Sequence, residues 1–240
     1  SMPRLNARQL LSVVESSLVQ AGWSFYTYDS SKPFGINVHR SGKGTLDLKV
    51  YIWNCTHGGG RARADDEYRI QFTGAVPTKH VGSETLLLGW YPELEVFAAW
   101  DVRMHENQDS GSPSAQIRRD VLERAYRNGF SVGKRANDEV VAAFKPEFIG
   151  EYAANVEAVH DGQVAELRDL DNLPNVDVRE AERNYGRRRV VSEIARAYRA
   201  YDFSRRVLSA YGHACSICGT QLKLVEAAHI VPVACDQSTD

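Results

Sequence analysis

The feature that most constrains the fold is a run of strand-like segments that follows one amphipathic helix near the start of the chain. Asn6 can cap this helix, whose apolar residues fall on one face and which is expected to end near Gly22. Segments rich in aromatic and β-branched residues follow, separated by Gly, Ser, Asp and Pro. The expected strands are residues 23–28, 35–39, 45–54, 67–74, 84–92 and 94–101. This pattern predicts a mostly antiparallel sheet.

Further helices and one more strand are expected after this sheet. They are a helix capped by Ser112 or Ser114 and stopped by Gly129, a strand at 138–146, and a helix at 146–159 that begins with Pro146. The fold class predicted for the chain is α+β, with helices flanking a curved sheet. Residues 1–160 are expected to form one such domain.

After residue 160 the chain has first an acidic and then a basic segment, although the net charge of the whole chain is only −2. Residues 161–177 hold five acidic residues, one Arg and one Pro, which indicates an acidic linker. Residues 178–206 hold nine Arg against four acidic residues, which predicts an Arg-rich helical connector. We therefore expect residues 161–202 to join two functional parts.

The arginines of this connector recur at near-helical spacing, so that one face could contact DNA phosphates. The candidate contacts are Arg183, Arg187, Arg188, Arg189, Arg196 and Arg199. The alternative is a solvated helix whose charges pair with one another, for example Glu193 with Arg189 or Arg196.

The cysteines are too few for the disulfide framework of a small secreted protein, and reduced thiols are expected. Cys215 and Cys218 form a C-x2-C knuckle closed by Gly219, the spacing at which two thiolates can bind one structural Zn2+. Cys235 is a possible third ligand, whereas His213 lies too close to the knuckle. The alternative is a turn with two packed thiols and no metal.

The segment that contains the knuckle, "FSRRVLSAYGHACSICGTQLKLVEAAHIVP" (203–232), resembles the first part of the HNH endonuclease motif. That motif reads "FRxxVLxAYgxxCxxCG" followed by "leAaHIxP", and the resemblance extends over residues 203–240. It implies a ββα-metal nuclease that hydrolyses DNA phosphodiesters, as many restriction enzymes do. The histidine matching His229 would be the general base, and a divalent cation such as Mg2+ would stabilise the leaving oxyanion. A lone histidine at a strand end is otherwise a structural residue.

Two departures from the HNH pattern affect the expected activity. Ala228 stands where many relatives carry an Asp or His metal ligand. The Asn that orients the base and the second metal-ligating His would lie beyond Asp240, so the ββα-metal domain is expected to be incomplete. We therefore expect residues 1–240 not to cut DNA by themselves.

The order of the parts resembles that of modification-dependent, type IV-like restriction endonucleases, in which a reader domain precedes an HNH domain. The resemblance implies that residues 1–160 read double-stranded DNA that carries a modification such as methylation. Candidate contacts are aromatic rings that could stack on a flipped base and arginines of a Gly-rich loop near the phosphate backbone. These are Trp53, Trp90, Trp100, Arg61 and Arg63. The alternatives are core tryptophans and a simple hairpin loop.

Two other interpretations stay open. Asp47-x-Lys49, with Asp29 or Glu67, resembles half of a PD-(D/E)xK nuclease signature, although a solvent-facing strand explains the same alternation. The protein could also be a non-catalytic DNA-binding or regulatory module with a structural zinc knuckle.

Location and assembly follow from weaker signals. No apolar run approaches the roughly 20 residues that span a bilayer, and the N-terminus has no secretory pattern. We expect a cytoplasmic protein without a membrane partner. A homodimer is possible, because enzymes that cut both DNA strands often pair.

Overall fold

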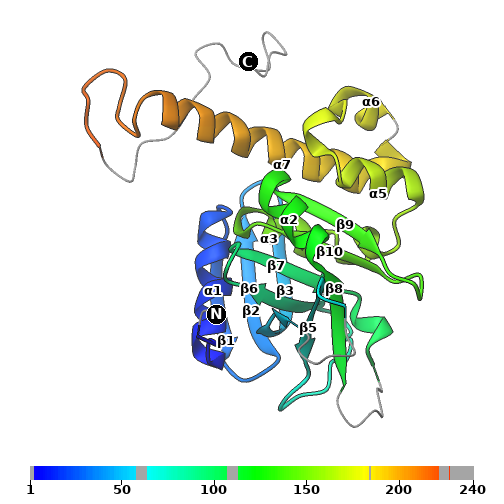
Figure 1. Cartoon of the computed structure of the whole chain (residues 1–240). Helices are drawn as coiled ribbons and strands as arrows, with labels where there is room; N and C mark the ends of the chain where they lie inside the picture. The colour runs from blue at the N-terminus through cyan, green and yellow to red at the C-terminus, as the bar shows by residue number, and fades with distance from the viewer. Residues whose placement is uncertain (1–2, 58–63, 107–112, 184, 222–226, 228–240) are drawn as a thin grey trace.

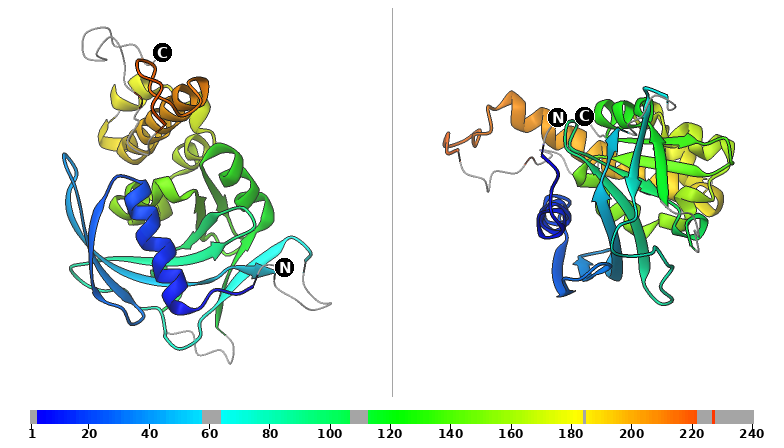
Figure 2. Two further views of the ribbon diagram at one scale, coloured as in Figure 1. Left: turned by 90° about the vertical axis from the view of Figure 1, so that its left-hand side faces the viewer. Right: turned by 60° about the horizontal axis from the view of Figure 1, so that its bottom comes forward.

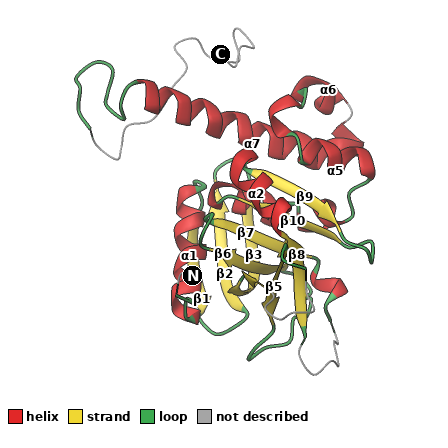
Figure 3. Cartoon of the chain, viewed as in Figure 1, coloured by secondary structure: helices red, strands yellow, loops and turns green. Residues whose placement is uncertain are grey.

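The computed structural model describes residues 3–57, 64–106, 113–183, 185–221 and 227, and it describes side chains in these ranges except at residues 182–188. In this part of the chain a seven-stranded mixed sheet, a three-stranded sheet and seven α-helices form the α+β fold that the sequence predicts (Figures 1 and 3). No helix within the described residues is both long and apolar enough to cross a lipid bilayer.

The large sheet has the strand order β1-β2-β3-β6-β7-β10-β9. Its strands are β1 (Ser24–Asp29), β2 (Phe34–Arg40), β3 (Gly44–Asn54), β6 (Glu84–Tyr91), β7 (Val96–Trp100), β10 (Val140–Phe144) and β9 (Phe130–Lys134). Neighbouring strands are antiparallel except β3 and β6, which run parallel from the Leu48–Glu84 pair to the Asn54–Trp90 pair. The expectation of a mostly antiparallel sheet is therefore confirmed.

The small sheet is formed by the chain that connects β3 to β6 and by one later strand. Its order is β4-β5-β8, with β4 (Thr56–His57), β5 (Glu67–Gln71) and β8 (Ser114–Arg118). Along β8, Ala115 and Ile117 are buried and alternate with less buried polar residues. This alternation fits a strand with one face on the core.

The first helix, α1 (Ala7–Gln20), begins as the sequence predicts. The Asn6 side chain accepts a hydrogen bond from the Gln9 backbone N–H, and the Gln9 side chain accepts one from the Asn6 N–H, each at 2.9 Å. This reciprocal cap satisfies two backbone donors that the first helical turn leaves free. Leu10, Val14 and Leu18 lie on the buried face, and Figure 2 shows α1 lying along the sheet.

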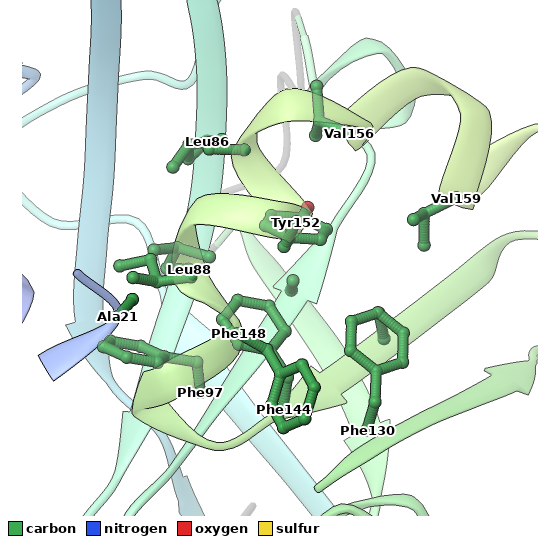
Figure 4. Packing of buried hydrophobic residues seen from close by; sticks show 14 of the residues in the cluster. Ala21, Leu86, Leu88, Phe97, Phe130, Phe144, Phe148, Tyr152, Val156 and Val159 are labelled. Carbon is green, nitrogen blue, oxygen red and sulfur yellow. The ribbon is translucent and has the colours of Figure 1, made fainter. Parts of the chain in front are cut away.

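Two apolar cores cover the two faces of the large sheet. The first core joins α1 to β2, β3 and the later helices, and Figure 4 shows the aromatic rings at its centre, Phe97, Phe130, Phe144, Phe148 and Tyr152. The second core lies between the large sheet, the small sheet and α2 (Arg119–Asn128). The central strands of the large sheet are therefore covered on both faces, which explains why most residues of β6 and β7 are buried.

Several expected elements differ in the structure. The helix predicted from Ser112 or Ser114 begins only at Arg119, because residues 114–118 pair with β5 as β8. It does end at Gly129, whose φ of 84° is in the left-handed region. Strand β9 was not predicted. The helix expected at 146–159 is divided into η2 (Pro146–Phe148), α3 (Ile149–Ala154) and α4 (Val156–His160), with Asn155 between the last two.

The segment predicted as an acidic linker is a folded part of the core, so that prediction is wrong. Residues 161–177 contain α5 (Val164–Leu170) and η3 (Leu173–Asn175). Leu170 and Leu173 are fully buried in the first core. Burial of a leucine stabilises the fold by about 1.5–3 kcal/mol, so these two side chains hold the segment in the core although its surface carries acidic residues.

The Arg-rich connector is helical, as expected, and forms α6 (Val178–Arg183) and α7 (Tyr185–Ala210). Val190, Val191, Ile194 and Ala195 of α7 are buried in the same first core as α1. Figure 1 shows α7 lying across one end of the molecule, with its C-terminal part extending beyond the sheet. Packing is thus continuous across residue 160, where a domain boundary was predicted.

Gly89 of β6 lies close to the small sheet. A Cβ atom at this position would lie 2.7 Å from Ile70 Cγ2 and 3.2 Å from both Cys55 Cβ and Trp100 Cη2. We expect Gly89→Ala to lower the free energy of unfolding by about 1–3 kcal/mol, because the second core must shift to accept one methyl group. Urea denaturation checks this, and an unchanged midpoint would contradict the close approach.

Candidate nucleic-acid interface and cysteine knuckle

The cysteine knuckle follows directly after α7. The helix ends through backbone hydrogen bonds from Tyr211 to Val207 and from His213 to Leu208, and His213 takes a φ of 57°. The Cys215 N–H donates to the Thr220 carbonyl, and the Gly219 N–H donates to the Cys215 carbonyl, each at 2.9 Å.

Gly219 closes this turn with a φ of 71°, a conformation that glycine adopts without steric cost. Cys215 is half-buried and Cys218 is exposed, and neither forms a disulfide bond. The turn that the C-x2-C-G sequence predicts is therefore present.

The electrostatics of the turn favour a thiolate at Cys218. Its Sγ lies 3.1 Å from the Thr220 Oγ1. Hydrogen bonds from Thr220 and from Cys215 lower the pKa of Cys218 to about 7. The thiolate is the form that binds soft metal ions, so this pair fits two of the four positions of a structural Zn2+ site.

The remaining ligands are not among the described residues, where no group of three His, Cys, Asp or Glu side chains could share one metal ion. Cys235 and the expected general base His229 lie outside the described part of the chain. Two thiols do not suit Mg2+, which prefers oxygen ligands. The knuckle is therefore a candidate for zinc, and the predicted Mg2+ site stays a prediction.

The exposed face of α7 carries the candidate arginines whose side chains the structure describes. Arg189 and Arg196 are both exposed, and Arg189 Nε donates to Glu193 Oε1 at 2.9 Å. Arg199 donates to the Val176 carbonyl at 2.9 Å and so connects α7 to the end of η3. The side chains of Arg183, Arg187 and Arg188 lie outside the described residues. The expected ion pair between Glu193 and Arg189 is present.

Two further arginines on α7 were not singled out from the sequence. Arg205 and Arg206 are exposed and both form ion pairs with Asp202, at 2.8 and 3.1 Å. They lie on the part of the helix that leads into the knuckle. Because one carboxylate serves both, the pair keeps a net positive charge.

The three candidate tryptophans lie in the two cores. Trp53, Trp90 and Trp100 have exposed fractions of 6%, 7% and 0%. Trp53 donates its indole N–H to the Thr73 carbonyl at 3.1 Å, and Trp100 donates to the Gln116 carbonyl at 2.8 Å. This burial fits the alternative of core tryptophans better than rings that stack on a flipped base. Arg61 and Arg63 lie outside the described residues.

The residues of the alternative nuclease signature lie partly together. The pKa of Lys49 is raised by interaction with the Tyr28 hydroxyl and by the charges of Asp47 and Asp29, whereas Glu67 belongs to the small sheet. Both Asp47 carboxylate oxygens already accept hydrogen bonds, one from the Tyr28 hydroxyl at 2.8 Å and one from Ser83. Hydroxyl groups of the protein thus already occupy both oxygens of the Asp47 carboxylate that a metal ion would need as ligands.

Sequence reasoning missed one cleft, which has a volume of about 590 Å3 and lies between α1, η2 and α7. Its polar and aromatic residues come from separate segments of the chain. No local motif marks them, so only the packing of these elements brings them together.

Comparison with known proteins gives one match. Residues 46–153, from β3 to α3, match the family described as Methylase-associated X1. No curated protein and no solved structure matches the chain. The match fits the context of a restriction or modification system.

Proposed function

We propose that this protein is a DNA endonuclease of a restriction system. In this proposal the N-terminal α+β part selects modified double-stranded DNA, and an HNH centre with His229 as general base hydrolyses the phosphodiester. The observation that carries the proposal is the occurrence, in one chain, of a methylase-associated segment at 46–153 and an HNH-like knuckle segment from Phe203.

The structure supports the proposal at two places. The C-x2-C-G turn is closed by backbone hydrogen bonds, and the pKa of Cys218 is lowered; both features suit a structural zinc knuckle. Helix α7 joins the core of the α+β part to this knuckle and carries exposed arginines along its length. Arginines on one helix face suit contacts to DNA phosphates.

The proposed chemistry assigns separate tasks to the chain's own residues. His229 is to remove the proton from the attacking water, since an imidazole with a pKa near 6.5 is mostly neutral at pH 7. Cys215 and Cys218 are to hold zinc and so fix the turn that precedes the segment containing His229. A divalent cation, when bound, supplies charge stabilisation of the leaving oxygen.

Replacing His229 by Ala is expected to lower the rate of DNA cleavage by at least about 100-fold, the usual contribution of a general base. Cleavage is measured on methylated and unmethylated plasmid DNA with Mg2+, using the complete product of the gene. His39→Ala is a matched control, because His39 is an exposed histidine on β2. Cleavage at the original rate by His229→Ala would exclude the assigned base.

A non-catalytic DNA-binding module is the second candidate function. It is favoured by the described knuckle itself, whose two candidate ligands are thiols suited to a structural metal ion. The same cleavage assay separates the two candidates. A complete protein that retains zinc and binds modified DNA without cutting it would support the module.

A further inference from the structure

The cleft of about 590 Å3 combines accessible aromatic rings with a buried carboxyl group. Its walls come from α1, the end of β6, the turn before β7, the C-terminal half of α2, η2 and α7. The volume lies within the range of about 300–1,000 Å3 that is usual for small-molecule sites. Its main polar and aromatic residues are Gln20, Trp90, Tyr126, Lys145, Glu147 and Tyr201.

Glu147 is the buried acid of this cleft, with an exposed fraction of 9%. Its Oε2 accepts a long hydrogen bond of 3.4 Å from Gln20 Nε2, and its Oε1 has no hydrogen-bond partner among the described residues. Buried carboxyl oxygens are nearly always hydrogen-bonded in folded proteins. Glu147 lines the cleft, and the bond that its Oε2 accepts is long, so a ligand that brings a donor fits beside this acid.

The interaction between Glu147 and Tyr201 joins η2 to α7. Burial raises the pKa of Glu147. Burial, together with the interaction with Glu147, also raises the pKa of Tyr201 to about 12. The phenol is therefore neutral near pH 7 and offers the cleft an aromatic face next to the acid.

The rim of the cleft carries an exposed ring and a positive charge. Tyr126 at the end of α2 is 50% exposed, and Lys145 Nζ lies 5.3 Å from the centroid of its ring. Arg205 lies one helical turn after Tyr201, close enough for its charge to lower the pKa of that phenol. Lys145 thus lines a site whose inner wall holds an acid, and Arg205, which is paired with Asp202, lies near the same site.

We propose that this cleft binds a nucleobase carrying an exocyclic amino group, as part of a nucleotide turned out of DNA. The base stacks on Tyr126 or Tyr201 and donates its amino hydrogens to Glu147, while Lys145 and Arg205 are beside the phosphates. The inference rests on the proposed function, from which DNA is taken as the ligand. Unlike Trp53 and Trp100, which are in the second core, Tyr126 is accessible to a base.

The first test measures binding of free nucleotides by calorimetry, with residues 1–240 and the 5′-monophosphates of deoxycytidine, deoxyadenosine, deoxyguanosine and thymidine. The three bases with an amino group are expected to bind at least about tenfold more tightly than thymine, which has none. Equal affinity for all four, or no binding of any, would overturn the inference.

Two variants test the assigned residues. Glu147→Gln keeps the size of the side chain and removes its charge, and Tyr126→Ala removes the exposed ring. Each is expected to weaken binding of the amino-bearing monophosphates at least about tenfold. The matched controls are Glu123→Gln, a partly exposed acid on α2, and Tyr26→Ala, an exposed tyrosine on β1. Thermal melting of each variant shows whether it is folded.

A third measurement separates failure of this inference from failure of the proposed function. Binding of duplex DNA is compared between the unaltered chain, Glu147→Gln and Tyr126→Ala. Weaker duplex binding by the two cleft variants supports the inference. Equal duplex binding by all three overturns it and leaves the proposed function standing, whereas no duplex binding by the unaltered chain contradicts the proposed function itself.

Discussion

Replacement of Glu139 by Ala is expected to lower the free energy of unfolding by about 3–5 kcal/mol. Glu139 is a buried acid directly before β10, and each of its two carboxylate oxygens contacts a different side chain. Oε1 lies 2.6 Å from His105 Nε2, and Oε2 lies 2.8 Å from an Arg135 guanidinium nitrogen. Without the carboxylate, His105 and Arg135 lose the acceptor that compensates their burial.

Chemical denaturation of Glu139→Ala measures this loss. Glu123→Ala is the control, because Glu123 also pairs with an arginine, Arg119, but on the surface of α2. An exposed pair contributes little to stability, so the control should unfold at nearly the original midpoint. If both variants unfold at the same denaturant concentration, the buried cluster does not stabilise the fold.

The same carboxylate gives the fold a pH dependence. Burial acts to raise the pKa of Glu139, but hydrogen bonding and charge from His105 and Arg135 outweigh it and leave the pKa lowered. A folded-state pKa below the unfolded value means that the stabilisation is present above about pH 4.3 and is lost as pH falls through the folded pKa. Between pH 6 and pH 3, Glu139→Ala should therefore lose less stability than the unaltered protein.

The elements that the sequence predicted well are those specified by local patterns. The helix from Ala7 begins at Asn6 because both partners of its cap lie within three residues of one another. The strands of the large sheet other than β9 were recognised from aromatic and β-branched residues between turn residues. Strand β8 was missed, since the partner that makes residues 114–118 a strand is β5, more than forty residues earlier.

The error at the acidic segment has a different cause. Five acidic residues suggested a linker, yet Leu170 and Leu173 decide its structure because they complete the first core beside α7. Charge on the outer face of a helix costs little in water, whereas its buried residues determine where it packs. Composition alone does not separate a solvated linker from the outer layer of a core.

The candidate site was also predicted only in part: the knuckle turn was predicted, but the burial of the tryptophans was not. The knuckle turn depends on Gly219 and two cysteines within five residues, so the sequence specifies it locally. Whether a tryptophan is in a core or in a pocket depends on what covers that face of the sheet. For Trp53 and Trp100 the cover is the small sheet, whose pairing no local motif predicts.

Trp100 supplies the second large expected effect. Its ring is fully buried between the two sheets and packs against Gly89. Its indole N–H donates a hydrogen bond to the Gln116 carbonyl at 2.8 Å. Replacement by Ala removes this volume and the hydrogen bond between the sheets. We expect Trp100→Ala to lower the free energy of unfolding by about 3–5 kcal/mol, as measured by chemical denaturation.

Trp100→Phe distinguishes a core role from the stacking role that the sequence suggested. Phenylalanine keeps a ring in the second core but loses the hydrogen bond to Gln116, so its destabilisation should be smaller than that of Trp100→Ala. DNA affinity, measured where the variant is fully folded, should equal that of the unaltered chain, because a ring with no exposed surface contacts no base. Weaker DNA binding by a stable Trp100→Phe would instead require the two sheets to separate around this residue when DNA binds, and would return Trp100 to the list of base contacts.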